Sequence, residues 1–184
     1  FGFRARNAGD VDNDNRDDII IGAYLANANG TNSGKVYIYS GRNGNLIHTM
    51  EGEGPGDKFG IRLERVADIN LDNHSDIMIA SESVNGSNKR EGGVYVYSGQ
   101  SGWPIYRFVG ENPDDDFGIR MRGITDMNKD NYPDIIISAA QNDEAGINAG
   151  KIYVYSGRTG RQLFAFTGEN AGDQLGRPLG DIYD

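Results

Sequence analysis

The stretch Asp10–Asp18, DVDNDNRDD, decides the fold of this chain, because the same pattern of oxygen-bearing side chains returns twice more. The second copy is DINLDNHSD at 68–76 and the third is DMNKDNYPD at 126–134, so the copies lie 58 residues apart. Each copy has Asp or Asn at loop positions 1, 3, 5 and 9, and alternate residues of a tightly curled loop point inward. The pattern therefore predicts three cages of oxygen ligands for a cation.

The predicted ligands are all oxygen atoms, because position 7 adds only a backbone carbonyl. Calcium accepts about six to eight oxygens in irregular geometry, whereas magnesium prefers a strict octahedron and keeps its water. The sequence thus predicts about three calcium sites. The predicted ligands, loop by loop, are Asp10, Asp12, Asp14, Arg16 and Asp18, then Asp68, Asn70, Asp72, His74 and Asp76, and then Asp126, Asn128, Asp130, Tyr132 and Asp134.

Two positions distinguish these loops from EF-hand loops. Position 6 is Asn15 in the first copy, and Asn stands there in the others; Asn adopts a left-handed conformation more readily than other non-glycine residues. Position 12 is Ile21 in place of a bidentate Glu, and the residues around it read as a buried strand. A single copy is equally consistent with a polar turn, but three copies in register favour cation binding.

The repeat extends well beyond the loops. Residues 1–58, 59–116 and 117–174 align without a gap, and 18 columns are identical in all three. The sequence of each unit predicts four strands. The loop follows the first strand, a variable connection follows the apolar second strand, and a tight turn joins the third strand, of the VYVYSG type, to the fourth. An all-β fold follows, with three four-stranded antiparallel blades of a partial β-propeller domain. Residues 175–184 predict the first strand of a fourth repeat.

The order of motifs is similar to the FG-GAP repeat of integrin alpha-subunit propellers. The features that carry the resemblance are Phe-Gly at the start of each unit, the D-x-[DN]-x-D-N-x-x-D loop, Gly22-Ala23 and the VYVYSG-type strand. The resemblance implies that partners bind on the face opposite the calcium loops. That face is formed by residues 24–33, 53–58, 82–91, 111–116, 140–149 and 169–174.

Two further columns have predicted structural roles. Arg4 and its equivalents Arg62 and Arg120 are expected to pair with a neighbouring carboxylate of the Asp57 type. Asp57 and its equivalents Asp115 and Asp173 are expected to close turns by accepting hydrogen bonds from nearby amides.

Composition excludes several classes of function. The net charge is −9 and no basic stretch offsets it, which argues against a nucleic-acid partner. No apolar run is long enough to predict a membrane span, and no motif of a serine hydrolase or a zinc protease occurs. Three complete units cannot close a ring, so further copies of the repeat are expected, from a longer chain, a homo-oligomer or a fibre.

The sequence therefore predicts a non-enzymatic module located outside the cell or at the cell surface. Its function would be adhesion or protein–protein interaction, with calcium in a structural role and a protein or glycan ligand. Two alternatives remain open at this stage. One is a self-assembling unit of an extracellular fibre, and the other is a carbohydrate-binding lectin or a polysaccharide lyase built on a propeller.

Overall fold

A computed structural model describes residues 2–178 of the chain, and these residues contain strands, turns and loops but no α-helix. The strands within this part are β1 (Arg4–Gly9), β2 (Asp18–Ala23), β3 (Lys35–Tyr39), β4 (Leu46–Glu51), β5 (Arg62–Val66), β6 (Asp76–Ser81), β7 (Gly93–Tyr97), β8 (Pro104–Val109), β9 (Phe117–Ile124), β10 (Asp134–Ala139), β11 (Lys151–Tyr155) and β12 (Gln162–Thr167).

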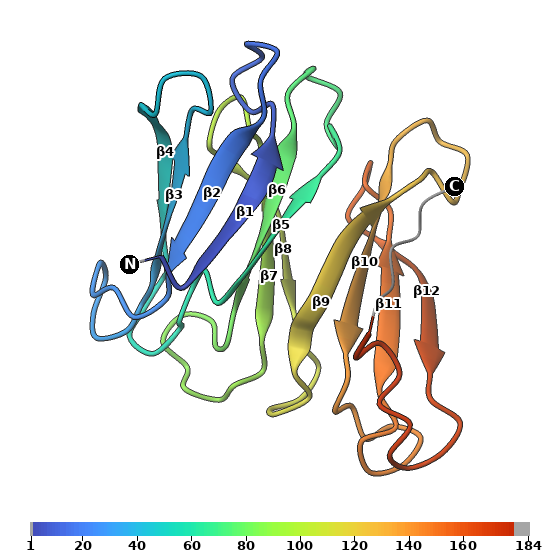
Figure 1. Cartoon of the computed structure of the whole chain (residues 1–184). Helices are drawn as coiled ribbons and strands as arrows, with labels where there is room; N and C mark the ends of the chain where they lie inside the picture. The colour runs from blue at the N-terminus through green and yellow to red at the C-terminus, as the bar shows by residue number, and fades with distance from the viewer. Residues whose placement is uncertain (1, 179–184) are drawn as a thin grey trace.

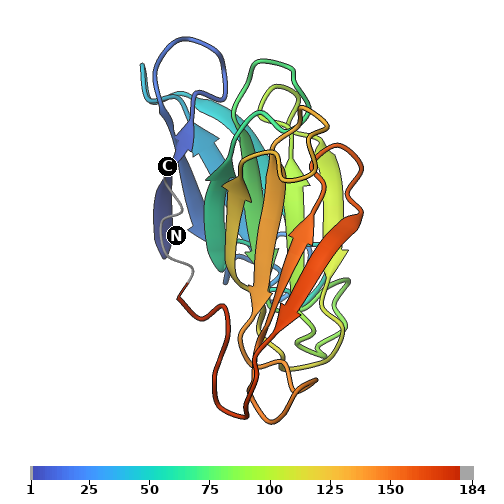
Figure 2. The same cartoon turned by 90° about the vertical axis from the view of Figure 1, so that its right-hand side faces the viewer.

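The strands form three separate sheets, each of four antiparallel strands in sequence order (Figure 1). The first sheet is β1-β2-β3-β4, and β5 to β8 and β9 to β12 repeat the same meander. This result confirms the all-β prediction and the strand order predicted for each unit. The sheets stack face to face without closing into a ring, and Figure 2, which looks onto the third sheet, shows the other two behind it.

Apolar residues on both faces of the middle sheet explain why the sheets stack. Ile77 and Ile79 of β6 pack toward the first sheet, whereas Met78 and Ala80 of the same strand pack toward the third. Strand side chains alternate between faces, so a strand that is apolar throughout can fill two interfaces. All six residues of β6 are buried. The core therefore consists of two layers, one on each side of the second sheet.

The Phe-Gly pair that opens a unit holds neighbouring sheets together. Phe59 is 1% exposed and packs edge-on against Tyr95, and its backbone forms a parallel bridge with Gly34 of the preceding unit. Phe117 is likewise buried and packs against Tyr153. The opening Phe of the second unit thus packs on its own sheet and also bridges to the unit before it.

The start of the predicted fourth repeat lies partly within the described residues. Leu175 forms a parallel bridge with Gly150, as Phe59 does with Gly34. Residues 179–184, which complete the first strand predicted for that repeat, lie outside the described part of the chain, as does Phe1. No helix of residues 2–178 has the length and apolar character that crossing a membrane requires.

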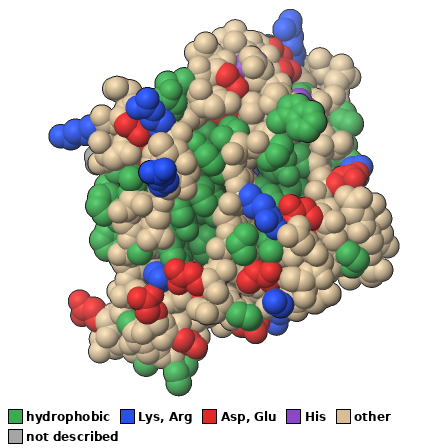
Figure 3. All heavy atoms as spheres, turned by 180° about the vertical axis from the view of Figure 1, so that it is seen from behind, with side chains coloured by type: hydrophobic (Ala, Val, Ile, Leu, Met, Phe, Trp, Pro, Cys, Tyr) green, Lys and Arg blue, Asp and Glu red, His purple; other side chains and the backbone are tan. Residues whose placement is uncertain are grey.

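The outer face of the third sheet exposes side chains that the other sheets bury. Phe166 is 54% exposed. At the same position of the repeat, Met50 in the first unit is 4% exposed and Phe108 in the second is 8% exposed. Phe108 is covered by Tyr155 of the next sheet, at a ring-centroid distance of 4.3 Å. Figure 3 views the molecule from behind relative to Figure 1, and on that face too apolar side chains gather over the middle. Among residues 2–178, no further sheet covers Phe166.

Candidate metal centres

The three Asp-rich loops share one backbone conformation. Position 6 has a positive φ in every copy, 66° at Asn15, 67° at Asn73 and 70° at Asn131, which confirms the left-handed conformation predicted there. Position 4 is left-handed as well, although Leu71 and Lys129 occupy it in the second and third loops. The left-handed conformation is unfavourable for such side chains. The surrounding hydrogen bonds therefore impose the curl of the loop on whatever residue stands at position 4.

The carboxylate at position 1 supplies the first set of these hydrogen bonds. Asp10 accepts from the backbone amides of Asp14 at 3.0 Å and Asn15 at 2.9 Å, one on each oxygen. Asp68 and Asp126 accept from the equivalent amides of their own loops. The first residue of each loop thus folds the following five residues around its own side chain.

The carboxylate at position 9 connects the loop to a second turn. Asp18 is 1% exposed; it accepts from the amide of Val11 at 2.8 Å and from the amide of Gly41, in the turn between β3 and β4, at 2.9 Å. Asp76 binds Ile69 and Gly99 in the same way, and Asp134 binds Met127 and Gly157. Sequence reasoning predicted these residues as cation ligands and missed the contact with the hairpin turn.

The first loop brings three carboxylates together. Asp10, Asp12 and Asp18 each offer an oxygen, and these oxygens lie within 4.8 Å of one another. The pKa of Asp12 is raised, first by burial and then by the negative charges of Asp18, Asp14 and Asp10. A divalent cation would relieve this repulsion, and hard oxygen donors at this spacing suit calcium. The donor set of the first loop therefore fits the predicted ion.

The second and third loops hold fewer carboxylates, because Asn replaces Asp at position 3. The amide of Asn70 donates to Asp72 at 2.8 Å, and Asn128 donates to Asp130 at 3.0 Å. Within residues 2–178, only the first loop forms a group of at least three acidic ligands. Each of these Asn side chains offers one uncharged carbonyl oxygen as a ligand, whereas Asp12 offers two charged carboxylate oxygens.

Position 7 and Asp14 lie at the edge of the loops. The amide of Arg16 donates to Asp14 at 3.0 Å, and Arg42 forms a long ion pair of 4.0 Å with the same carboxylate. Tyr132 lies beneath the guanidinium of Arg158.

His74 joins the second loop to the first. Its Nδ1 lies 2.7 Å from the carbonyl oxygen of Val11, and the amide of Ser75 donates to the carbonyl of Asp10 at 2.9 Å. Two of the candidate sites are therefore in direct backbone contact.

Burial of the position-9 carboxylate in the second loop predicts an unusual pH dependence. Burial raises the pKa of Asp76 to about 6 from the ordinary value of 3.8, and the charges of Asp72 and Asp68 act in the same direction. Folding therefore favours the neutral acid, and this contribution to stability is complete below the unfolded pKa and is lost as pH rises through the folded pKa. Without calcium, we expect the wild type to lose stability relative to Asp76→Asn between about pH 4 and about pH 7.

Urea denaturation of both proteins after removal of calcium measures this difference. Comparing the two proteins at each pH cancels the contributions of titrating groups that do not interact with Asp76. A difference between them that does not change over this range would contradict the raised pKa of Asp76.

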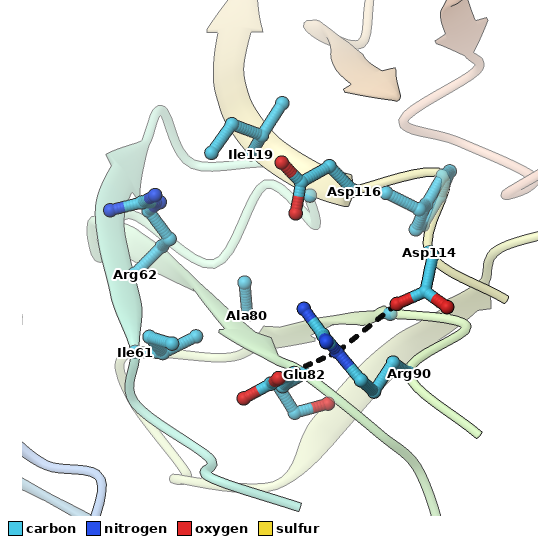
Figure 4. A pocket seen from close by; sticks show the side chains of 12 residues that line it. Ile61, Arg62, Ala80, Glu82, Arg90, Asp114, Asp116 and Ile119 are labelled. Atoms are coloured by element: carbon cyan, nitrogen blue, oxygen red, sulfur yellow. Dashed lines mark ion pairs between the residues drawn. The ribbon is translucent and has the colours of Figure 1, made fainter. Parts of the chain in front are cut away.

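The face opposite the loops contains a pocket of about 170 Å³ between the second and third sheets (Figure 4). Arg90 lies between Glu82 and Asp114 and forms ion pairs with Glu82 at 2.9 Å and with Asp114 at 3.2 Å. Asp116 points into the same space from the start of β9. All four of these residues belong to the segments 82–91 and 111–116 that the resemblance assigned to a ligand face.

The predicted role of Asp57 is confirmed, but the predicted pairing of the arginines is wrong. Asp57 closes its turn by accepting from the amide of Gly54 at 2.8 Å, and it also accepts from the amide of Gly86 of the second unit at 2.7 Å. Asp115 accepts from the side chain of Asn142, and Asp173 accepts from the amide of Asn170. Arg4 donates instead to the carbonyl of Ile61 at 2.7 Å. No ion pair in the described part of the chain joins the arginine column to the Asp57 column.

Comparisons with known proteins agree with this architecture. A family model described as the FG-GAP repeat matches residues 7–39. Integrin alpha-6 of Homo sapiens is 36% identical over 114 residues, which are 60% of this chain and 10% of that protein. Integrin alpha-8 of Gallus gallus is 29% identical over 174 residues, which are 86% of this chain and 16% of that protein. The chain thus spans a small part of these relatives.

A comparison of folds gives a propeller-like neighbour. The crystal structure of the exotype rhamnogalacturonan lyase YesX superposes with a TM-score of 0.55, covering 93% of this chain and 33% of the lyase chain. The sequence identity is 13%, so this likeness concerns the fold alone.

Proposed function

Because the chain belongs to the FG-GAP repeat family and has integrin alpha chains among its relatives, we propose that it is a non-enzymatic, extracellular, calcium-binding propeller module. Its function would be adhesion or another protein–protein interaction at the cell surface. The relatives support the adhesion-type module, and the calcium role rests on the loops themselves.

The observation that carries the calcium proposal is the cluster of Asp10, Asp12 and Asp18, with oxygens within 4.8 Å of one another. Positions 1, 3, 5, 7 and 9 of each loop would hold one ion. The ion would neutralise the converging carboxylates and hold the end of the first strand of each sheet against the start of the second. Its role would be structural, because the position-9 carboxylate of each loop also accepts a hydrogen bond from the hairpin turn between the third and fourth strands of its sheet.

Calcium is expected to raise the thermal stability of the protein. Extracellular calcium modules bind with dissociation constants of roughly 10⁻⁴–10⁻³ M. Calcium at ten times such a constant adds about 1.4 kcal/mol for each occupied site, so the melting temperature should rise by several degrees. Thermal melting in calcium and in chelator measures the effect, with magnesium at the same concentration as the control. An unchanged melting temperature would rule out the structural role.

The face opposite the loops is the proposed ligand surface. Its connecting segments vary in sequence among the three units while keeping their length, and the pocket of Figure 4 combines positive and negative side chains there. Surface loops on a rigid scaffold commonly carry recognition. A protein ligand with charged side chains suits this pocket, and a glycan is the second candidate.

The lack of enzymatic activity is part of the proposal. Both histidines are engaged with backbone carbonyls, His48 with Gly99 and His74 with Val11, and they lie in different units. Neither contact resembles an acid–base pair facing a pocket. A lyase assay on acidic polysaccharides together with a glycan array tests the alternative. Turnover would overturn the non-enzymatic proposal, and binding without turnover would favour a lectin.

A specific observation favours a second candidate function, in which copies of the chain associate through their terminal sheets. Phe166 is exposed although the same column is buried in the other two sheets, which fits a face that another sheet of the same kind covers. Such association would produce a larger propeller or a fibre. Sedimentation of the calcium-loaded protein over a range of concentrations tests it, and a strictly monomeric protein would count against it.

A further inference from the structure

The inner strands of the three sheets place arginine side chains at the same register. Arg4 pairs with Gly22, Arg62 pairs with Ala80, and Arg120 pairs with Ser138, so each lies at the equivalent point of its sheet. The strand β5 lies against β1 on one side and β9 on the other, as the central part of Figure 1 shows. The three arginines therefore face one common space along the axis of the array.

This space is a cavity of about 620 Å³. Among residues 2–178, its lining includes one acid, Glu64, and six arginines, namely Arg4, Arg6, Arg62, Arg120, Arg122 and Arg177. The whole chain carries a net charge of −9, so a positively charged cavity is not expected from its average composition. A recess lined by one sign of charge concentrates ions of the opposite sign.

The arginines of the repeat column have no carboxylate partner in the described part of the chain. Arg4 donates to the carbonyl of Ile61, and Arg120 donates to its neighbour Ile119 at 2.9 Å. Arg62 forms no ion pair within residues 2–178. The pKa values of Arg4 and Arg62 are lowered, first by burial and then by other guanidinium groups, which include Arg120 in both cases. Like charges therefore repel one another across the cavity.

Few acids among the described residues oppose this charge. The pKa of Glu64 is raised by burial, against the opposing effects of Arg122, Arg6 and Arg65. Asp116 of the neighbouring pocket offsets part of the charge of Arg62 and also accepts a hydrogen bond from Gln141 at 2.6 Å. Among the described lining residues, Arg4, Arg6, Arg62, Arg120 and Arg177 thus face the single carboxylate of Glu64.

We propose that this axial arginine cavity binds an oxyanion. A guanidinium group presents parallel N–H donors that match the oxygens of sulfate, phosphate or carboxylate, and several such groups around one space suit a polyvalent anion. The bound anion would link the inner strands of different sheets. This site is separate from the Asp-rich loops and does not depend on the calcium proposal.

Sulfate is the probe of choice, because phosphate precipitates with calcium. The measurement is a titration of backbone amide NMR shifts at constant ionic strength, with chloride replaced by sulfate, since ionic strength alone changes surface electrostatics. We expect saturable shifts centred on Ile61, Arg62 and Ile119. Arg62→Gln combined with Arg120→Gln should weaken sulfate binding by about tenfold or more. Arg161→Gln, an exposed arginine of the β11–β12 turn, is the matched control and should bind as the wild type does.

A second measurement remains informative if the double variant changes stability. Without sulfate and at low salt, removing two repelling charges should leave the double variant at least as stable as the wild type. Sulfate should then stabilise the wild type more than the variant, beyond the general stabilising effect of sulfate on both. Absence of saturable binding in the wild type, or equal binding by the double arginine variant, would overturn the proposal.

Discussion

Gly34→Ala is expected to lower the free energy of unfolding by about 3 kcal/mol or more. The φ of Gly34 is 90°, and a left-handed conformation costs an alanine roughly 1–2 kcal/mol. The added Cβ would also lie 2.2 Å from the carbonyl oxygen and 2.4 Å from the amide nitrogen of Phe59. Both atoms are backbone and cannot move aside, so overpacking adds a further 1–3 kcal/mol, roughly. The bridge between the first and second sheets would have to open.

Gly44→Ala separates the two causes. Gly44 also has a positive φ, 73°, but no heavy atom lies within 4 Å of an added Cβ. Its replacement should therefore cost only the backbone strain, about 1–2 kcal/mol. Urea denaturation of both variants gives the two free energies. Equal losses would show that the contact between Gly34 and Phe59 does not restrain the sheets.

Asp134→Ala is expected to destabilise the protein by about 3 kcal/mol whether or not calcium is present. The carboxylate is fully buried and accepts from the amides of Met127 at 2.7 Å and Gly157 at 3.0 Å. Loss of the buried hydrogen bond of Gly157 leaves an amide without a partner at a cost of about 1–3 kcal/mol, and the partly buried amide of Met127 adds to that cost. The loop and the β11–β12 turn would both lose their anchor.

The control is Asp12→Ala, which removes an exposed carboxylate from the three-carboxylate cluster. Without calcium this change should be neutral or slightly stabilising, because it reduces repulsion with Asp10 and Asp18. With calcium it should be destabilising, because a ligand is lost. Denaturation of both variants in calcium and in chelator distinguishes the two roles. If Asp134→Ala were harmless in chelator, position 9 would act only as a cation ligand.

The repeat made most of the fold predictable from the sequence. Three aligned units with alternating apolar strands led to three four-stranded meanders, and the Asn at position 6 led to the left-handed turn found at Asn15. These features depend on neighbours within one unit, and the sequence displays such neighbours directly. The turn-closing role of Asp57 was predictable for the same reason.

Contacts between units were harder to predict. The arginine column was expected to pair with the Asp57 column, but the arginines line the axial cavity, whereas Asp57 binds the amides of Gly54 and Gly86. Alignment of repeats shows that a residue recurs, but it gives no direction relative to the next unit. The contact of Asp18 with Gly41 was missed, although one signal was present. Gly41 recurs in all three units, and a Cβ there would lie 1.9 Å from the carbonyl oxygen of Asp17.

The backbone contact between the first two loops makes their proposed ions thermodynamically linked. Ser75 donates its amide to Asp10, but the equivalent residue of the third loop is Pro133, which has no N–H to donate. Ordering of the first loop would therefore favour ordering of the second, while the third lacks this connection. Positive cooperativity is then expected between the sites of the first and second loops. A calcium titration should fit a model with two coupled sites and one independent site. Linkage also requires reciprocity, so an ion in the second loop would strengthen binding in the first by the same factor.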